Sequence, residues 1–203
     1  MTVEQLTYEL KKKLSPKRFM HTLAVRDTAL YLGHFILPDA LSELEWAALL
    51  HDVAKELTPE EQIDLLGADY DNLTDAEKAA PLVYHAYTAP KIIKRDYPTL
   101  ATDRVLSAVF KHTTLDGDAT LFDEIIFIAD YIEPNRTLKG AIDTRDYLLR
   151  AISDNRDESI HALHRACLMS LDNTLAYLAS TSHAPVERSL RARDFLIDKI
   201  KNY

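Results

Sequence analysis

Apolar residues recur at helical spacing along almost the whole chain, and no segment alternates apolar and polar residues convincingly with a period of two. This pattern predicts an all-α fold. Only four of the 203 residues are glycine and 47% are hydrophobic, which is typical of a globular chain and not of a disordered one. Without internal repeats or linker-like segments, we expect a single-domain helical bundle over residues 1–203.

Start and stop signals divide the chain into helices. Ser15-Pro16 has the form of an N-cap followed by proline and opens a long helix through Phe35. Pro38 opens another that runs to about Lys55, and Thr58 caps a third, before a polar loop with a short helical turn over 67–80. Further helices are expected at roughly 82–96, 102–112, 120–132, 144–153, 156–180 and 185–202.

The formal net charge of -8 provides no overall positive field, so we do not expect a nucleic acid polymer as partner. The single cysteine, Cys167, rules out a disulfide framework within the chain, fits a reducing cytoplasm and is interpreted as a small apolar filler. No signal-peptide region and no apolar run near the ~18 residues of a membrane span are found. We expect a cytoplasmic protein with no membrane partner, and a homodimer is one assembly that the sequence leaves open.

The segment AALLHDVAK (47–55) sets His51 and Asp52 side by side, a dipeptide that means little on its own. Asp130 is more informative, because it follows a helix that is apolar on nearly every side and is therefore expected to be buried. A buried carboxylate is costly unless it is paired, hydrogen-bonded, protonated or bound to a metal. Asp130 thus indicates a metal site, a cap for a neighbouring helix or an ion pair with Arg136.

Three further histidines join these residues in a regular order along the chain. His21 lies on a mostly apolar helix face, His85 opens a helix and His112 closes one. A lone histidine on an apolar face is more often a core residue than a ligand, so the ordered series carries the inference. The remaining histidines are assigned no functional role: His34, His161, His164 and His183.

The order His, His-Asp, Asp resembles that of the HD superfamily of metal-dependent phosphohydrolases, which have an all-helical fold. Within it, residues 15–150 resemble the YqeK family through RFMHTLAV (18–25), ALLHDVAK (48–55), His85-Ala86, KHTT (111–114) and FDEIIFIADYIEPNR (122–136). Residues 151–203 share only general helical character with it. The resemblance implies a symmetrical bis(5'-nucleosyl)-tetraphosphatase, which splits diadenosine tetraphosphate into two ADP by attack of a metal-bound hydroxide on an inner phosphorus.

Mixed imidazole and carboxylate ligation suits iron, manganese, cobalt, nickel or zinc, and the resemblance implies one or two iron ions. By position, the metal ligands are His21, His51, Asp52 and Asp130. His85 and His112 either complete a second metal site bridged by Asp52 or bind phosphate. The catalytic candidates are Asp52, Lys55 and Asp130. The substrate-binding candidates are Arg18, His85, His112, Thr113 and Arg136.

Three departures from the family pattern concern loop shape and nucleotide contacts. Leu115 stands where glycine is expected, Glu124 stands where lysine is common, and the segment after His85 lacks a usual glycine. In the C-terminal half, Tyr177 and Arg188 are candidates for contacts with base or ribose.

Two other functions compete with this hypothesis. One is an HD phosphohydrolase that acts on mononucleotides. The other is a metal-free helical module that binds nucleotides without catalysis, against which the complete series of ligands argues.

Overall fold

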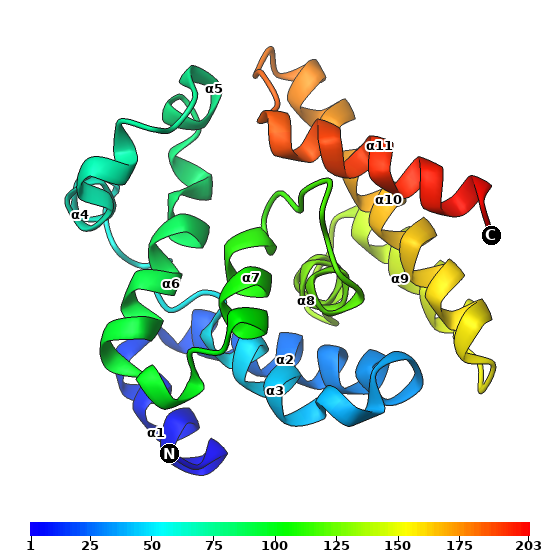
Figure 1. Cartoon of the computed structure of the whole chain (residues 1–203), viewed down its shortest axis with the longest axis horizontal. Coiled ribbons are helices and arrows are strands. Elements are labelled where there is room, and N and C mark those ends of the chain that lie inside the picture. Colours follow the sequence, from blue (N-terminus) through cyan, green and yellow to red (C-terminus); the bar gives the residue numbers. More distant parts are fainter.

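The computed structural model describes residues 1–203, and its regular elements are all helices, which confirms the expected all-α fold (Figure 1). Short 3-10 turns join several of them, and the α-helices are α1 (Val3–Lys13), α2 (Pro16–Ile36), α3 (Leu41–Leu50), α4 (Pro59–Leu66), α5 (Asp75–Lys78), α6 (Tyr84–Asp96), α7 (Asp103–Lys111), α8 (Leu121–Ile132), α9 (Lys139–Ala151), α10 (Arg156–Ser180) and α11 (Glu187–Lys201). None of these helices combines the length and apolar character that a membrane crossing requires.

Helix α8 lies near the middle of the molecule and is seen end-on in Figure 1. It packs against α2, α7 and α10, and α10 in turn packs against α9 and α11. Every residue from Phe122 to Ala129 is buried, which confirms the expectation from its apolar sequence. Asp130 follows this run and lies at the end of α8 where α2 passes.

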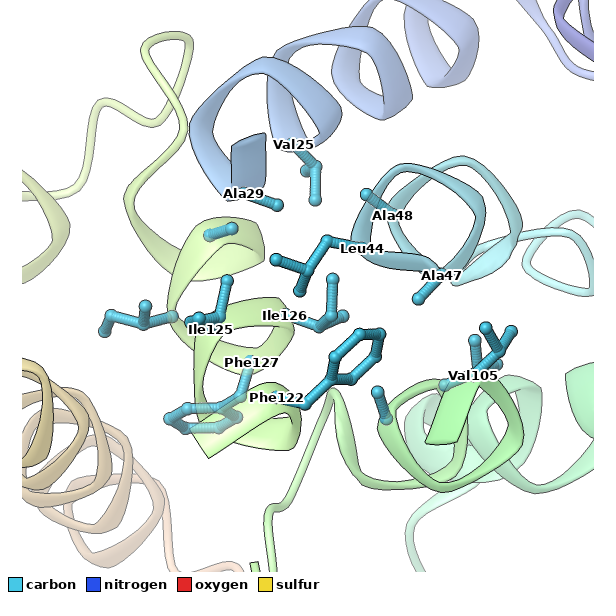
Figure 2. Packing of buried hydrophobic residues seen from close by; sticks show 14 of the residues in the cluster. Val25, Ala29, Leu44, Ala47, Ala48, Val105, Phe122, Ile125, Ile126 and Phe127 are labelled. Carbon is cyan, nitrogen blue, oxygen red and sulfur yellow. The ribbon is translucent and has the colours of Figure 1, made fainter. Parts of the chain in front are cut away.

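The main hydrophobic core forms where α2, α3, α7 and α8 meet. Figure 2 shows Val25 of α2, Leu44 of α3 and Ile126 of α8 pointing toward one another. Helices α2 and α3 approach closely at Gly33, where an added Cβ would lie 2.5 Å from Leu44 Cδ1. Cys167 is fully buried in the same core, as expected of an apolar filler.

The helix expected from Pro38 to about Lys55 is shorter in the structure. A 3-10 turn over Pro38–Ala40 leads into α3, which ends at Leu50. Beyond this point backbone hydrogen bonds join Val53 N to Leu50 O and Lys55 N to Asp52 O, so the chain tightens into successive turns of the 3-10 type. His51 and Asp52 therefore lie just past the end of a helix and not inside one.

Helix α9 begins at Lys139, earlier than the expected start at 144. Gly140 lies in its first turn, where an added Cβ would meet the side chains of Asn173 and Tyr131 at 2.8 and 2.9 Å. Close packing therefore extends the helix over a residue of low helix propensity. The other expected helices begin and end close to the predicted residues, and the polar segment 67–80 contains a 3-10 turn and the short α5. Helix α1 (Val3–Lys13) precedes them and was not predicted.

Candidate metal centre

Six side chains that are far apart in the sequence meet at one place in the fold. His21 comes from the second turn of α2, His85 from the first turn of α6 and Asp130 from the end of α8. The structure also brings His51, Asp52 and His112 to this place, from the chain that follows α3 and α7. The whole ordered series predicted from the sequence therefore converges.

Asp130 and Asp52 form the two carboxylate centres of this cluster. Nε2 of His21 lies 3.0 Å from Asp130 Oδ1 and 3.6 Å from Asp52 Oδ2. Nε2 of His51 lies 3.3 Å from Asp52 Oδ2 and 4.0 Å from Asp130 Oδ1. The two aspartates thus face the same pair of imidazole nitrogens.

The buried Nε2 atoms of His21 and His51 have no hydrogen-bond partner, although carboxylate oxygens are near. Two ligand groups, whose donor atoms all lie within 4.8 Å of one another, are His21, His51 and Asp130, and His51, Asp52 and His112. Unpartnered buried nitrogens beside carboxylates fit a divalent transition-metal ion.

Two of the histidines are oriented by the helix that precedes them. Nδ1 of His51 donates to Ala48 O at 2.6 Å, and Nδ1 of His112 donates to Val109 O at 2.6 Å. Each ring satisfies a carbonyl at the end of its helix, which fixes the proton on Nδ1 and leaves Nε2 free to bind. The helix ends after α3 and α7 therefore present both ligands.

His85 lies on the other side of Asp52 from His21. Its Nε2 is 3.3 Å from Asp52 Oδ1 and 3.0 Å from His112 Nε2. Lys55 Nζ lies 3.2 Å from the ring nitrogens of His85, and Thr113 Oγ1 lies 3.3 Å from His85 Nε2. These four side chains form a polar group next to Asp52 Oδ1 that offers an ammonium, a hydroxyl and imidazoles to a ligand.

Asp52 and Asp130 each form an ion pair with an arginine. Arg18 Nη1 donates to Asp52 Oδ2 and Arg136 Nη2 donates to Asp130 Oδ1, both at 2.5 Å. Arg136 Nε also donates to the backbone oxygen of Asp130 at 2.9 Å. Both guanidinium groups are partly exposed, so they lie between the carboxylates and solvent; Asp52 is buried, whereas Asp130, which was expected to be buried, is 20% exposed. The ion pair of Asp130 with Arg136, predicted as an alternative to a metal, thus coexists with a metal-binding arrangement.

The protonation of the cluster follows from burial and neighbouring charge. Burial raises the pKa of Asp52, but the neighbouring imidazoles, His51 first, outweigh it and hold the pKa well below its usual range. Burial likewise raises the pKa of Asp130, and His21 and Arg136 bring it well below the usual range. Both carboxylates are therefore ionised and ready to bind a cation.

The pKa of His85 is well below its usual range, because of burial first and then the neighbouring His112 and Lys55. A low pKa keeps the ring neutral at physiological pH, which is the form that can bind a metal or accept a hydrogen bond. Burial also lowers the pKa of Lys55. The Lys55 side of the cluster therefore contains a neutral imidazole beside the lysine amine.

Glu133 is a buried member of the site that the sequence did not reveal. Its Oε1 lies 3.2 Å from Nδ1 of His21, and its Oε2 accepts the Asn135 N–H at 2.7 Å. The Glu133 carboxylate therefore contacts the imidazole of His21, a predicted ligand, on the nitrogen opposite Nε2. Its position in the segment 122–136, three residues after Asp130, is the signal that could have identified it.

Other charged residues of the C-terminal half serve different contacts. Arg188 donates to Glu77 Oε1 at 3.1 Å and to Asp116 Oδ2 at 2.9 Å, so its partners here are protein carboxylates. Tyr177 is an exposed residue of α10. Glu124, at the position where lysine is common, is buried and lies 2.7 Å from Nδ1 of His164.

Comparisons with known proteins point to one family. The model of the HD domain family matches residues 18–135. The chain is 31% identical to the symmetrical bis(5'-nucleosyl)-tetraphosphatase of Staphylococcus aureus over 84% of this chain and 86% of that protein, and 29% identical to its Bacillus subtilis namesake over 88% of each. The fold is also similar, with a TM-score of 0.83 and 28% identity over 98% of both chains, to a crystal structure from Clostridium acetobutylicum described as a predicted HD superfamily hydrolase involved in NAD metabolism.

Proposed function

This chain belongs to the HD domain family and to its symmetrical bis(5'-nucleosyl)-tetraphosphatases, and from that premise we propose that it hydrolyses diadenosine tetraphosphate into two ADP. The observation that carries the proposal is the convergence of two ionised aspartates with four histidines, two of which have buried, unpartnered Nε2 atoms. This arrangement supports a bound divalent metal, and we propose iron in one or two copies, with manganese, cobalt, nickel or zinc as substitutes.

The proposed ligands of the metal are His21, His51, Asp52 and Asp130. When bound, such an ion supplies an activated water near neutral pH and a positive charge beside the phosphates. Asp52 Oδ2 lies 3.3 Å from His51 Nε2 and Asp52 Oδ1 lies 3.7 Å from His112 Nε2, so both ligand groups would share Asp52 if two ions bind. Asp130 and Asp52 also orient the attacking water as hydrogen-bond acceptors.

Positively charged side chains of the protein neutralise the charge of the substrate phosphates. Arg18 and Arg136 lie at the partly exposed edge of the aspartates, where they can turn to phosphate oxygens and neutralise charge that builds during attack. On the other side, Lys55 and Thr113 with the neutral His85 hold the phosphates of the leaving ADP. His112 serves either as a second-site ligand or in this phosphate group.

The products of hydrolysis test the proposal directly. Metal-loaded protein incubated with diadenosine tetraphosphate should release ADP as its nucleotide product. Release of ATP plus AMP, or no turnover, would contradict the proposal, and faster turnover of mononucleotides would favour the other hydrolase function. The His51→Ala variant should lose turnover, whereas His161→Ala, which alters a histidine outside the cluster, should keep it.

Location and assembly are parts of the same proposal. The single cysteine supports a reducing, cytoplasmic setting. Sedimentation of the purified chain would establish whether it forms a homodimer.

A further inference from the structure

Arg188, in the first turn of α11, contacts four other segments of the chain. Its Nε donates to Glu77 Oε1 in α5 at 3.1 Å, and its Nη1 donates to Asp116 Oδ2 in the loop after α7 at 2.9 Å. Its guanidinium carbon lies 5.6 Å from the ring centroid of Tyr87 in α6 and 4.6 Å from that of Phe110 in α7. One side chain of the C-terminal helix thus joins α5, α6, α7 and the loop that follows α7.

The rings of Tyr87 and Phe110 form an aromatic pair between α6 and α7, with centroids 5.2 Å apart. Tyr87 follows His85 by two residues, and Phe110 precedes His112 by two. The Nε2 atoms of these two histidines lie 3.0 Å apart, so the aromatic pair and the histidine pair are successive contacts between the same two segments. A cation over aromatic faces is attracted to both rings and opposes their separation. The Arg188 guanidinium therefore helps to set the distance between His85 and His112.

The loop after α7 carries Thr113, and the first turn of α11 holds this loop in place. Ser189 Oγ donates to the backbone oxygen of Thr114 at 3.1 Å, and Asp116 accepts from Arg188. Thr113 Oγ1 in turn lies 3.2 Å from the Nε2 atom of the preceding histidine. The anchoring of the loop to α11 thus also fixes the Thr113 hydroxyl at the metal centre.

Glu77 makes the contact of Arg188 with α5 specific. This carboxylate is buried, and it accepts from Tyr87 Oη at 2.9 Å and from the backbone N–H of Thr74 at 2.9 Å. A buried carboxylate is costly without a cationic partner, and Arg188 provides that charge. The Arg188 side chain is consequently held at one end by α5 and at the other by the loop after α7.

We propose that Arg188 is a positioning residue that sets the spacing of His85 and His112 and holds Thr113 beside them. It acts through the aromatic pair and the loop after α7, and it touches neither the metal nor the substrate. The inference rests on the proposed function, in which this side of the metal centre holds the phosphates of the leaving ADP. It gives α11 a role in the reaction, because displacement of such groups by about 1 Å can cost up to ~100-fold in rate.

The variant that tests this role is Arg188→Gln, which removes the cation. Arg191→Gln is the matched control, because Arg191 donates to the same Asp116 carboxylate from the same helix, yet its hydrogen bonds reach neither Glu77 nor the aromatic pair. Both arginines are partly exposed, so both variants should fold, and circular dichroism checks this. Arg188→Lys keeps the charge but not the forked guanidinium. It replaces Arg188→Gln if that variant does not fold, with a smaller effect in the same direction.

Two measurements on the full chain follow the spacing and the reaction separately. In zinc-loaded protein with isotope-labelled histidines, the ring NMR signals of His85 and His112 should shift in Arg188→Gln, whereas those of His21 should not. All of these signals should keep their wild-type positions in Arg191→Gln. The kcat for diadenosine tetraphosphate should fall about tenfold in Arg188→Gln and stay at the wild-type value in Arg191→Gln.

The inference is overturned by unchanged His85 and His112 signals in Arg188→Gln, by equal shifts in Arg191→Gln, or by a wild-type kcat in Arg188→Gln. A failure of the proposed function gives a different result. In that case the wild type does not release ADP from diadenosine tetraphosphate, and the NMR comparison still decides whether Arg188 positions the two histidines.

Discussion

Glu133 Oε1 lies 3.2 Å from Nδ1 of His21, and this contact joins residues that are 112 positions apart in the chain. The Glu133 carboxylate is itself held by the Asn135 N–H and buried beneath the metal centre. A carboxylate on the far nitrogen of a metal-binding histidine fixes the ring's orientation and tautomer. Glu133 is therefore a positioning residue that acts through His21.

Glu133→Gln should weaken metal binding without removing a ligand. The amide keeps the shape of the side chain but loses the charge that supports His21, so we expect metal affinity to fall about 10- to 100-fold. Competitive titration with a metal-binding dye measures this. The control is Glu56→Gln. Glu56 is an exposed carboxylate that lines the same surface groove as Glu133, and its substitution should leave the metal affinity unchanged. Equal affinities in Glu133→Gln and the wild type would show that Glu133 has no positioning role.

Leu115 adopts φ of 55°, in the left-handed region that favours glycine, yet its side chain is fully buried. The strain of that conformation is about 1–2 kcal/mol, and loss of a buried leucine costs about 2–5 kcal/mol. Leu115→Ala loses the packing and keeps the strain, whereas Leu115→Gly loses the packing and relieves it. Both should be destabilised in urea unfolding, the glycine variant by about 1 kcal/mol less. A more stable alanine variant would contradict this account.

Asp116 ties the loop after α7 to α11, because its carboxylate accepts from Arg188 and Arg191 at 2.9 Å each. Burial raises its pKa, but hydrogen bonds from Arg191 and a backbone N–H outweigh it, so the pKa is below the usual value. A lowered pKa stabilises the fold above the unfolded pKa of about 3.9, and this stabilisation is lost as pH falls through the folded pKa.

Asp116→Asn should therefore lower the free energy of unfolding at pH 7 by about 1 kcal/mol, a modest effect because Arg191 is half exposed. The difference from the wild type should shrink as the pH falls below about 4. Thermal unfolding across this pH range measures it, with Asp172→Asn, from an exposed pair with Arg193, as the control. A difference that is constant with pH would mean that the Asp116 charge contributes nothing.

The residues that meet in the cluster could be predicted because their signals are local. Asp130 was conspicuous as a charge after an apolar helix, and His51-Asp52 as a doublet after an alanine- and leucine-rich one. The helices could be predicted for the same reason, since capping residues and apolar spacing act over a few positions. The unusual glycine-like position of Leu115 also agrees with the departure noted from the family pattern.

The rest of the site depends on packing between distant segments. The contact of Glu133 with His21 exists only once α8 lies against α2. The early end of α3 has a local cause, because the His51 ring takes the Ala48 carbonyl that a longer helix would use, and apolar spacing does not report this side-chain contact. The residue pattern of a single sequence does not predict such contacts.

The central claim is that His21, His51, Asp52 and Asp130 bind a transition-metal ion. Elemental analysis of freshly purified protein, prepared without air or chelators, tests it most directly. We predict one or two transition-metal ions per chain, chiefly iron, in the wild type and in His161→Ala, and their loss from a folded His51→Ala variant. Wild-type protein without stoichiometric metal, or a His51→Ala variant with the wild-type metal content, would contradict the claim.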